Sequence, residues 1–290
     1  MTKWFILIGV VLILCIAEWI REIRTFRTTH YDITSEKLKS LKQEQKVLFL
    51  TDLHNNSYGK QNKRLLEAVR DQKPELILIG GDMLVGKKGK SAQVAADLVS
   101  QLAGICPVCY ANGNHEQRMK VYPETYGNAF REYATPLSEN GVIFLENKSM
   151  DFLWEDLPVQ IHGLEIPMEY YKPGHKRVLT AEDIEKCIGK PDDSKYQILL
   201  AHNPIYADAY IEWGADLILS GHLHGGIVRI PKLGGIITPQ FSFFPRYSGE
   251  LTVKENTSVV VSKGLGTHTI KMRFLNPAEL IVLHINGTKR

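Results

Sequence analysis

The chain has 290 residues, of which 44% are hydrophobic and 23% charged, and its formal net charge at pH 7 is +3. The apolar share is that of an ordinary globular protein, and the nearly balanced charge leaves no broad positive surface, so we expect no nucleic-acid partner. The four cysteines contain one C-x-x-C and no second one, which is not the pattern of a zinc knuckle and requires no disulfide framework.

The N-terminal segment is apolar, and we expect it to be separate from the fold. Residues 4–17 carry no charge and, extended to residue 20, reach about the lower limit for a helix that crosses a bilayer. Trp4 and Trp19 bracket this run like interfacial anchors. We expect residues 1–27 to be a single-pass membrane anchor with its flank; a cleaved signal peptide and a buried soluble helix are the alternatives. Basic residues are more numerous after the run than before it, which favours a cytoplasmic location for residues 28–290.

From residue 46 onward, short apolar runs end in polar clusters. The runs are residues 47–50, 76–79, 108–111, 198–201 and 217–219. Nearly continuous apolar runs of this length predict strands buried on both faces. Segments with helical spacing lie between them, at residues 65–71, 92–103 and 125–138 and after Thr180 and Pro204. This alternation predicts an α/β domain with a largely parallel sheet, so the clusters can meet at the carboxyl ends of the strands.

The rest of the chain is rich in strand-like segments with few helices between them. Residues 31–33 predict a short edge strand, and the later segments are residues 142–145, 147–153, 159–163, 251–254, 258–262 and 280–285. A second, mixed or antiparallel sheet packed on the first would contain the later segments. We find no linker after residue 46, so residues 28–290 are predicted to form one domain.

The polar clusters share metal-binding side chains: Asp52, His54, Asp82, Asn114, His115, His202, His222 and His224. Such groups are costly to bury at strand ends unless they coordinate something. Carboxylate, amide and imidazole donors without thiolate suit Mn, Fe, Zn, Co or Ni, with Mn favoured. The donors are too many for one ion, and two divalent ions about 3.5–4 Å apart fit better, an arrangement suited to in-line displacement at phosphorus.

These residues resemble, in order, the five signatures of the calcineurin-like metallophosphoesterases. The matching motifs are Asp52-Leu53-His54, Gly81-Asp82, Gly113-Asn114-His115-Glu116, His202 and Gly221-His222-Leu223-His224. The resemblance implies a four-layer α/β/β/α sandwich of two mixed sheets, here preceded by one transmembrane helix. Two features, the N-terminal anchor and the motif at residues 262–266, resemble those of one branch of the family, the small bacterial membrane-associated phosphodiesterases. Some members of that branch resemble UDP-diacylglucosamine pyrophosphatases.

The resemblance also implies roles for individual residues. Asp52, His54 and His224 would hold one metal ion, Asn114, His202 and His222 would hold the other, and Asp82 would bridge them. His115 would face the phosphate and stabilise or protonate the leaving oxygen, oriented by Glu116 or Asp82.

The predicted function is therefore hydrolysis of phosphodiester or pyrophosphate bonds at a membrane, by attack of a hydroxide held between the two ions, with His115 and Asp82 as catalytic residues. The anchor suggests a lipid-linked nucleotide diphosphate such as UDP-diacylglucosamine as substrate. A non-catalytic, metal-stabilised binding or scaffold module on the same fold is the alternative. Such modules lose ligands or the leaving-group histidine, whereas this chain keeps the full set.

One basic run stands apart from these motifs. Three lysines lie close together in Lys87-Lys88-Gly89-Lys90. The composition predicts an exposed loop, and contact with anionic lipid headgroups is a second interpretation of it.

Overall fold

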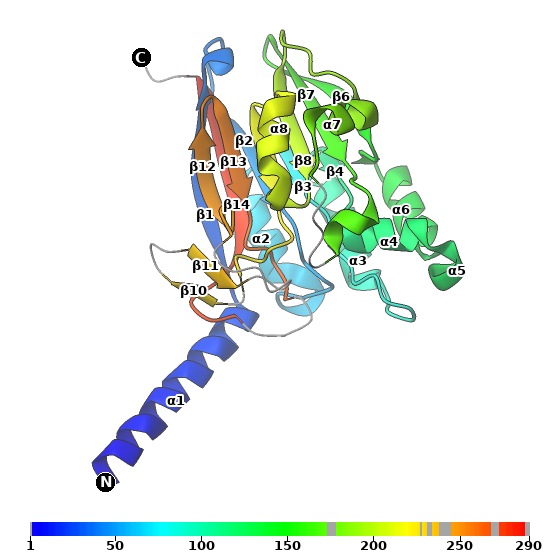
Figure 1. Ribbon diagram of the computed structural model, residues 1–290. Coiled ribbons are helices and arrows are strands. Elements are labelled where there is room, and N and C mark those ends of the chain that lie inside the picture. Colours follow the sequence, from blue (N-terminus) through cyan, green and yellow to red (C-terminus); the bar gives the residue numbers. More distant parts are fainter. Residues whose placement is uncertain are drawn as a thin grey trace.

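The computed structural model describes residues 2–172, 178–226, 228–230, 234–237, 245–267 and 273–287. Two six-stranded mixed sheets pack face to face, helices cover both outer faces, and one helix projects from the end of the fold (Figure 1). The predicted fold class, a four-layer α/β/β/α sandwich preceded by an apolar helix, is confirmed.

The first sheet contains the strands nearest to both ends of the described chain. Its order is β1 (Phe26–Ser35), β14 (Ala278–Gly287), β2 (Gln45–Leu50), β3 (Leu76–Ile79), β4 (Val108–Tyr110) and β5 (Val142–Phe144). Strands β2 to β5 are parallel, β14 is antiparallel to β2, and β1 is parallel to β14. Consequently β1 starts at the sheet end where β2, β3 and β4 finish.

The second sheet has the order β12 (Glu250–Lys254), β13 (Thr257–Val261), β9 (Leu217–Ser220), β8 (Tyr196–Ala201), β7 (Leu157–Leu164) and β6 (Lys148–Trp154). Its four central strands are parallel, and β12 and β6 pair antiparallel at the two edges. A small ribbon of β10 (Val228–Ile230) and β11 (Gly234–Ile237) lies outside both sheets.

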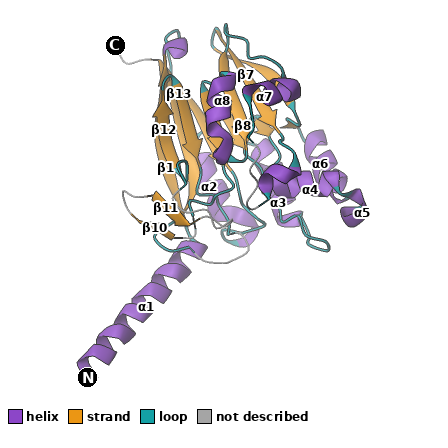
Figure 2. Cartoon of the chain, in the orientation of Figure 1, coloured by secondary structure: helices purple, strands orange, loops and turns teal. Residues whose placement is uncertain are grey.

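Each sheet carries its own helical layer. The helices α2 (Lys63–Gln72), α3 (Gln93–Ala103), α4 (Asn114–Val121) and α6 (Ala129–Glu139) pack on the first sheet, and α5 (Pro123–Tyr126) follows α4. The helices α7 (Ala181–Ile188) and α8 (Ala207–Trp213) pack on the second sheet (Figure 2). Single 3-10 turns, η1 (Glu36–Leu38), η2 (Lys60–Asn62), η3 (Met168–Tyr171) and η4 (Pro204–Tyr206), complete the connections.

Alternating side chains of the central strands enter two different cores. In β2, Val47 and Phe49 face the second sheet, whereas Leu48 and Leu50 face the helices of the first layer. Because successive side chains of a strand point to opposite faces, a strand between two apolar layers needs an unbroken apolar sequence. This double burial explains the short apolar runs seen in the sequence.

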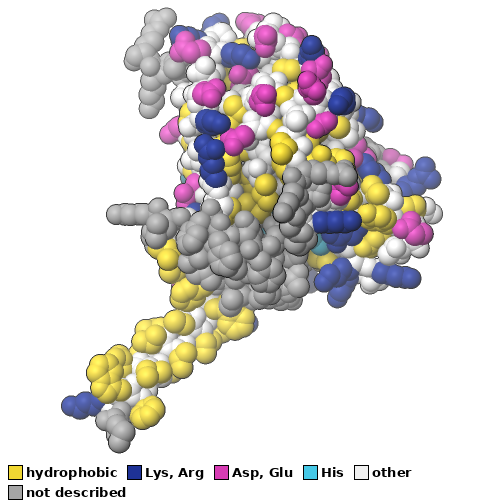
Figure 3. Space-filling view, viewed as in Figure 1, with side chains coloured by type: hydrophobic (Ala, Val, Ile, Leu, Met, Phe, Trp, Pro, Cys, Tyr) yellow, Lys and Arg dark blue, Asp and Glu magenta, His cyan; other side chains and the backbone are white. Residues whose placement is uncertain are grey.

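The N-terminal helix α1 (Thr2–Arg24) differs from all others in its exposure. By length and composition it could cross a membrane, since Lys3–Arg24 contains an 18-residue stretch with a mean hydropathy of 2.2 of which no residue is buried. Its apolar side chains form the yellow surface along the lower left of Figure 3. Only Thr25 separates α1 from β1, so the helix leads into the sheet without a linker.

The structure corrects the predicted division of strands. The runs that precede the polar clusters do not share one sheet: β2, β3 and β4 belong to the first sheet, but β8 and β9 belong to the second. Strands β5 and β14, expected in the second sheet, are in the first. Both sheets are buried on both faces, so the same kind of apolar strand fits either sheet. The prediction grouped strands by their order along the chain, and that order does not match sheet membership. The edge strand β1 is also longer than predicted, and α4 was not predicted.

Candidate metal centre

The predicted clusters meet at one end of the sandwich. Three sets of side chains place ligand atoms within 4.8 Å of one another: Asp52, His54 and His224; Asp82, His202 and His222; and His54, Asp82 and His115. All of these residues are buried. The side chains come from loops after strands of both sheets, so the site lies across the interface between the sheets.

Asp52, His54 and His224 form a compact donor set. The Nε2 atoms of His54 and His224 are 3.1 Å apart. Asp52 Oδ1 lies 3.4 Å from His224 Nε2 and 3.7 Å from His54 Nε2. Donor atoms that each lie about 2.0–2.2 Å from a single ion are about 3–3.5 Å from one another, so this spacing suits one divalent ion.

Asp82 lies between this set and the second one. Its Oδ2 atom is 3.2 Å from His202 Nε2 and 3.9 Å from the Nε2 atoms of both His54 and His115. His202 Nδ1 lies 2.7 Å from the Gly80 carbonyl oxygen. A carbonyl only accepts hydrogen bonds, so Nδ1 carries a proton and Nε2 is the nitrogen that faces Asp82. If Nε2 gave up its own proton to a cation, its lone pair would have the orientation that a metal ligand needs.

Asn114 begins α4, and the backbone N–H of the next residue, His115, donates to Asp82 Oδ1 at 2.7 Å. The Asn114 side chain is 4% exposed, and its Oδ1 atom has no hydrogen-bond partner among the described residues. A buried amide oxygen without a partner is costly, and coordination of a cation would satisfy it. The donor set as a whole therefore fits divalent metal ions.

Opposite charges face one another across the cluster. Burial raises the pKa of Asp52 to about 6, although the nearby His202 imidazole opposes this. Burial acts likewise on Asp82, but the His202 and His115 imidazoles outweigh it and hold the pKa of this carboxyl well below its usual value. Burial opposes protonation of His202, yet Asp82 and Asp52 raise its pKa to about 10. Divalent cations would supply the same compensating positive charge.

His115 has a fixed ring orientation. The backbone N–H of Gly86 donates to His115 Nδ1 at 2.8 Å. A neutral imidazole that accepts at Nδ1 carries its proton on Nε2, so His115 presents an N–H group on the side of Asp82. Any side chain at position 86 would clash, since a Cβ atom there would lie 2.5 Å from the His115 carbonyl oxygen.

Glu116 positions the loop that carries Asp82. Its carboxylate accepts hydrogen bonds from the backbone N–H groups of Asp82 at 2.8 Å, Met83 at 2.9 Å and Gly113 at 3.1 Å, and from the Tyr110 hydroxyl at 2.8 Å. The prediction gave Glu116 a role in orienting His115; these contacts instead give it a role in fixing the loops after β3 and β4.

Most of the candidate ligands have an unusual backbone conformation. Asp52, His54, Asp82, His222 and His224 all have positive φ angles, between 48° and 68°. This left-handed region is uncommon for residues other than glycine, and strain of this kind concentrates at functional sites. The loops therefore direct the side chains inward at a conformational cost that the surrounding structure must offset.

Close approach of the loops also requires glycine. A Cβ atom on Gly221 would lie 2.1 Å from Asp52 Oδ2, and one on Gly81 would lie 1.9 Å from the Gly113 nitrogen. The His222 backbone N–H donates to Asp52 Oδ2 at 3.0 Å across the interface between the sheets. Glycine at position 221 lets loops of the two sheets touch, and glycine at position 81 lets the loops after β3 and β4 touch.

Sequence reasoning missed several residues around the site. The Tyr171 ring packs with its centroid 5.1 Å from that of His222. Asn276 Nδ2 donates to the carbonyl oxygens of His224 at 2.7 Å and Gly226 at 2.6 Å. Arg273, 2% exposed, donates to the carbonyls of residues 263, 264 and 266. The glycine-containing motif at residues 262–266 was the one signal in the sequence for this part of the site.

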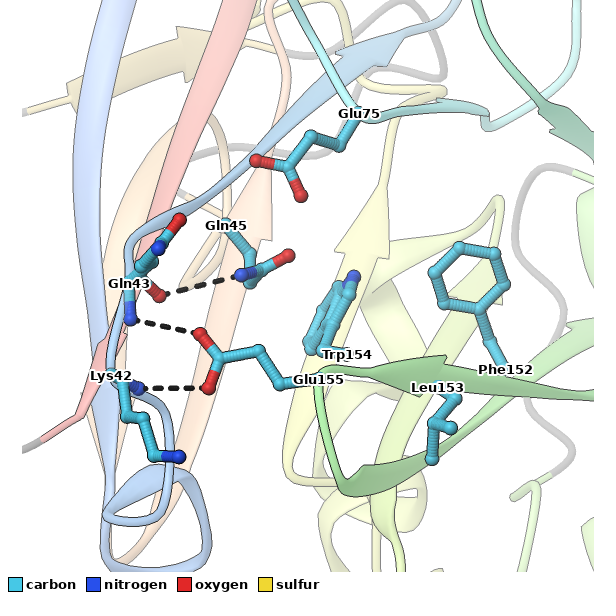
Figure 4. A pocket seen from close by; sticks show the side chains of 8 residues that line it. All are labelled: Lys42, Gln43, Gln45, Glu75, Phe152, Leu153, Trp154 and Glu155. Carbon is cyan, nitrogen blue, oxygen red and sulfur yellow. Dashed lines mark hydrogen bonds between the residues drawn. The ribbon is translucent and has the colours of Figure 1, made fainter.

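A cavity of about 620 Å³ lies at the opposite end of the sandwich. Its lining includes Trp154, Gln45 and Lys42 (Figure 4). The Glu155 carboxylate accepts hydrogen bonds there from the backbone N–H groups of Lys42 at 3.1 Å and Gln43 at 2.9 Å. Because residues 42 and 43 precede β2, the cavity is at the amino end of that strand and is separate from the metal ligands.

Comparison with known proteins identifies several relatives. The chain is 26% identical over 245 residues to YpbG of Bacillus subtilis, covering 83% of this chain and 81% of that protein. It is 29% identical over 252 residues to a metallophosphoesterase of Helicobacter pylori, covering 86% of this chain and 61% of that protein, less than two thirds of its length. Phosphodiesterase YaeI of Escherichia coli is 25% identical over 229 residues, with 77% and 75% covered.

Among solved structures, a phosphopantetheinyl hydrolase of Mycobacterium tuberculosis is similar, with a TM-score of 0.48 and 14% identity over 82% of this chain and 98% of that one. Residues 45–226 match the family model described as calcineurin-like phosphoesterase, a span that is more than half of the chain and includes every candidate ligand. The chain therefore belongs to the calcineurin-like phosphoesterase family and is a metal-dependent phosphoester hydrolase.

Proposed function

We propose that the protein is a membrane-associated phosphoesterase with two divalent ions, acting on phosphodiester or pyrophosphate bonds. Asp52, His54 and His224 hold one ion, and His202 and His222 hold the other with Asn114. The observation that carries this proposal is the division of the buried donors into two sets on either side of Asp82. Asp82 belongs to the second set and also lies 3.9 Å from His54 Nε2 of the first, so it would be the bridging ligand. Donors without thiolate favour Mn among the borderline and hard ions.

The protein residues then have defined tasks during hydrolysis. Divalent ions at such a pair of sites polarise phosphoryl oxygens and lower the pKa of water towards 7. His115 directs its Nε2 N–H into the same space and donates a hydrogen bond to the oxygen that leaves phosphorus. Its Nδ1 already accepts the Gly86 N–H at 2.8 Å and so is not open to a second proton. We infer that His115 stabilises the leaving oxygen as a hydrogen-bond donor and does not protonate it.

Direct assay tests the hydrolytic function. The full-length protein, in detergent and supplied with Mn²⁺, is expected to hydrolyse a generic aryl phosphodiester, and a chelator should abolish turnover. Asp82→Asn is the matched inactive control, because it keeps the size of the side chain and loses the bridging charge. A protein that binds two ions and hydrolyses no phosphodiester or pyrophosphate would refute the proposal.

The substrate is proposed to be lipid-linked, as in a nucleotide diphosphate attached to a lipid such as UDP-diacylglucosamine. Support comes from α1, which could cross a membrane and would hold the cytoplasmic domain beside its substrate. Lipid-linked nucleotide diphosphates, cyclic nucleotides and phosphomonoesters should be compared side by side in bilayers. We expect a preference for the lipid-linked substrate; activity on the soluble compounds alone would exclude this part of the proposal.

A further inference from the structure

We propose that the end of the fold that carries the metal centre docks on an anionic bilayer surface through the lysine loop (residues 87–90) and the last turn of α1. The inference rests on the proposed membrane location of α1. It adds an orientation: the metal centre faces the lipid headgroups, and the cavity near Trp154 faces away from the membrane.

Strand register places α1 at the metal end of the sandwich. Phe26, the first residue of β1, pairs with Ala278 at the start of β14, and Ile281 of β14 pairs with Phe49 near the end of β2. The start of β1 is therefore level with the carboxyl end of β2, from which Asp52 and His54 follow. Figure 1 shows the same arrangement, with α1 leaving the fold below the strand ends.

The last turn of α1 is fixed to the metal-binding loops. Glu22 is 1% exposed, and its Oε2 atom accepts a hydrogen bond from the Asn276 backbone N–H at 3.0 Å. The side chain of Asn276 in turn donates to the His224 carbonyl at 2.7 Å. The Thr25 hydroxyl donates to the Arg21 carbonyl at 2.7 Å, closing the helix end directly before β1. With no linker and these contacts, the direction of α1 sets the direction of the metal centre.

The lysine loop lies at the same end and is held against the candidate site. It follows Gly86, whose N–H binds His115 and whose carbonyl accepts the Tyr126 hydroxyl at 3.0 Å. On its other side, the Ser91 carbonyl accepts a hydrogen bond from Asn55 Nδ2 at 2.9 Å. Both ends of the loop are therefore anchored to the loops that follow β2 and β4.

The charges of the lysine loop have no local compensation. Residues 87–90 are all exposed, and no acidic residue occurs between Asp82 and Asp97. In the described part of the chain none of these lysines forms an ion pair, whereas Lys39, Lys190 and Lys195, at the opposite end, each face a carboxylate. Basic side chains also gather at the lower right of Figure 3, towards the end from which α1 leaves. Uncompensated positive charge beside a membrane helix fits an anionic lipid surface.

Exposed apolar side chains accompany this charge. Leu275, next to Asn276, is 47% exposed, and Ile205, which follows the His202 loop, is 53% exposed. A bilayer interface accepts apolar side chains together with lysine, because the apolar groups enter the boundary region and the amines meet headgroup phosphates. Docked in this way, the metal centre would reach a phosphoester at headgroup depth while the lipid stays in the bilayer.

Amide hydrogen exchange of the full chain in nanodiscs tests the orientation. Exchange is measured by mass spectrometry in discs of phosphatidylcholine alone and of phosphatidylcholine with phosphatidylglycerol. Each lysine near an anionic surface favours the docked state by about fivefold, so three lysines favour it by roughly a hundredfold. We expect amides 86–92 to exchange at least about tenfold more slowly in the anionic discs, and the protection to fall at about 1 M salt, where charges are screened within about 3 Å.

Two triple variants make the result specific. Replacing the loop lysines (Lys87→Gln, Lys88→Gln, Lys90→Gln) should remove the protection. The matched control (Lys39→Gln, Lys190→Gln, Lys195→Gln) changes the same total charge at the opposite end and should leave it intact. Any of three results would overturn the docking. Residues 86–92 could exchange equally in both kinds of disc, residues 39–44 could be protected instead, or the control variant could lose the protection to the same extent as the loop variant.

The readout is independent of hydrolysis. Protection without turnover of any phosphoester would leave the docking standing and remove the proposed function. Turnover without protection would leave the hydrolytic function standing and remove the docking. A chain that fails to enter nanodiscs through α1 would overturn the docking as well.

Discussion

Among single residues, His115 is the one whose role the geometry defines most narrowly. Its Nε2 N–H faces the Asp82 carboxylate from 3.9 Å, and its Nδ1 accepts from Gly86. Removing one preorganised donor of this kind lowers kcat by about 10²–10³. We expect that loss in His115→Ala for alkyl esters, whose leaving oxygen needs stabilisation, and less than about tenfold for 4-nitrophenyl esters.

Kinetics with leaving groups of graded basicity check this prediction, with metal content measured on the same preparations. His115 also belongs to a set of potential ligands with His54 and Asp82. Two ions retained in His115→Ala would agree with a donor role. Loss of an ion, or an equal effect on all leaving groups, would make His115 a ligand instead.

His222 and His224 are neighbours in sequence but belong to different donor sets. If this i, i+2 pair serves two ions as proposed, His224→Ala should weaken the site of Asp52 and His54. His222→Ala should weaken the site of Asp82 and His202. Elemental analysis is expected to give about one ion per chain in each variant and two in the wild type. His284→Ala, a change at a histidine that pairs with Glu44 on the surface, should keep both. Loss of both ions in either single variant would argue for one shared site.

At the level of elements, the junction of α1 and β1 makes the helix part of the domain. Glu22→Ala would leave the buried N–H of Asn276 without an acceptor, which costs about 1–3 kcal/mol. For a chain of this size we expect the melting temperature to fall by about 3–10 °C. Glu22→Gln keeps an acceptor at this position, so its melting temperature should fall by less.

Thermal unfolding of the variants in one detergent measures this effect. Glu18→Ala is the control on the same helix: Glu18 pairs with Arg21 at an exposed position, and such pairs contribute about 0–1 kcal/mol. If Glu22→Ala and Glu18→Ala both have the melting temperature of the wild type, α1 is an independent tether and is not rigidly joined to the domain.

The elements also show what the sequence can and cannot reveal. The meeting of the candidate ligands at one end was predictable, because each follows a short apolar run and burial on both faces leaves that run no polar residue until the strand ends. Sheet membership was not predictable, since β3 and β8 bury both faces in different sheets with similar sequences. Nor was the left-handed backbone of Asp52 or His224, because tertiary contacts impose it and the weak preference of Asp and His for this region does not single out these positions.

For the whole molecule, the candidate ligands come from both sheets and meet at one end. Asp52 and Asp82 follow strands of the first sheet, and His202 and His222 follow strands of the second. An ion held by both sheets stabilises only the packed sandwich, by about 2.7 kcal/mol at a free concentration of a hundred times Kd. Two such ions should raise the melting temperature by about 10–20 °C.

Calorimetry before and after chelation, followed by re-addition of Mn²⁺, measures this linkage. The double variant Asp52→Asn, Asp82→Asn keeps side-chain volume but loses the ligand charges, so its melting temperature should not respond to the chelator. If the melting temperature of the wild type also does not change on chelation, the ions contribute nothing to holding the two sheets together.

The position of β14 has a consequence for how the chain is made. This strand lies between β1 and β2, so the first sheet stays open until residues 278–287 have left the ribosome. At synthesis rates of about 5–20 residues per second, β1 waits on the order of tens of seconds for β14, its neighbour among the described strands. During that time a helix already in a membrane would hold β1 as an unpaired edge at the bilayer, exposed to wrong partners. Pairing of β14 thus closes the first sheet and removes the exposed edge of β1.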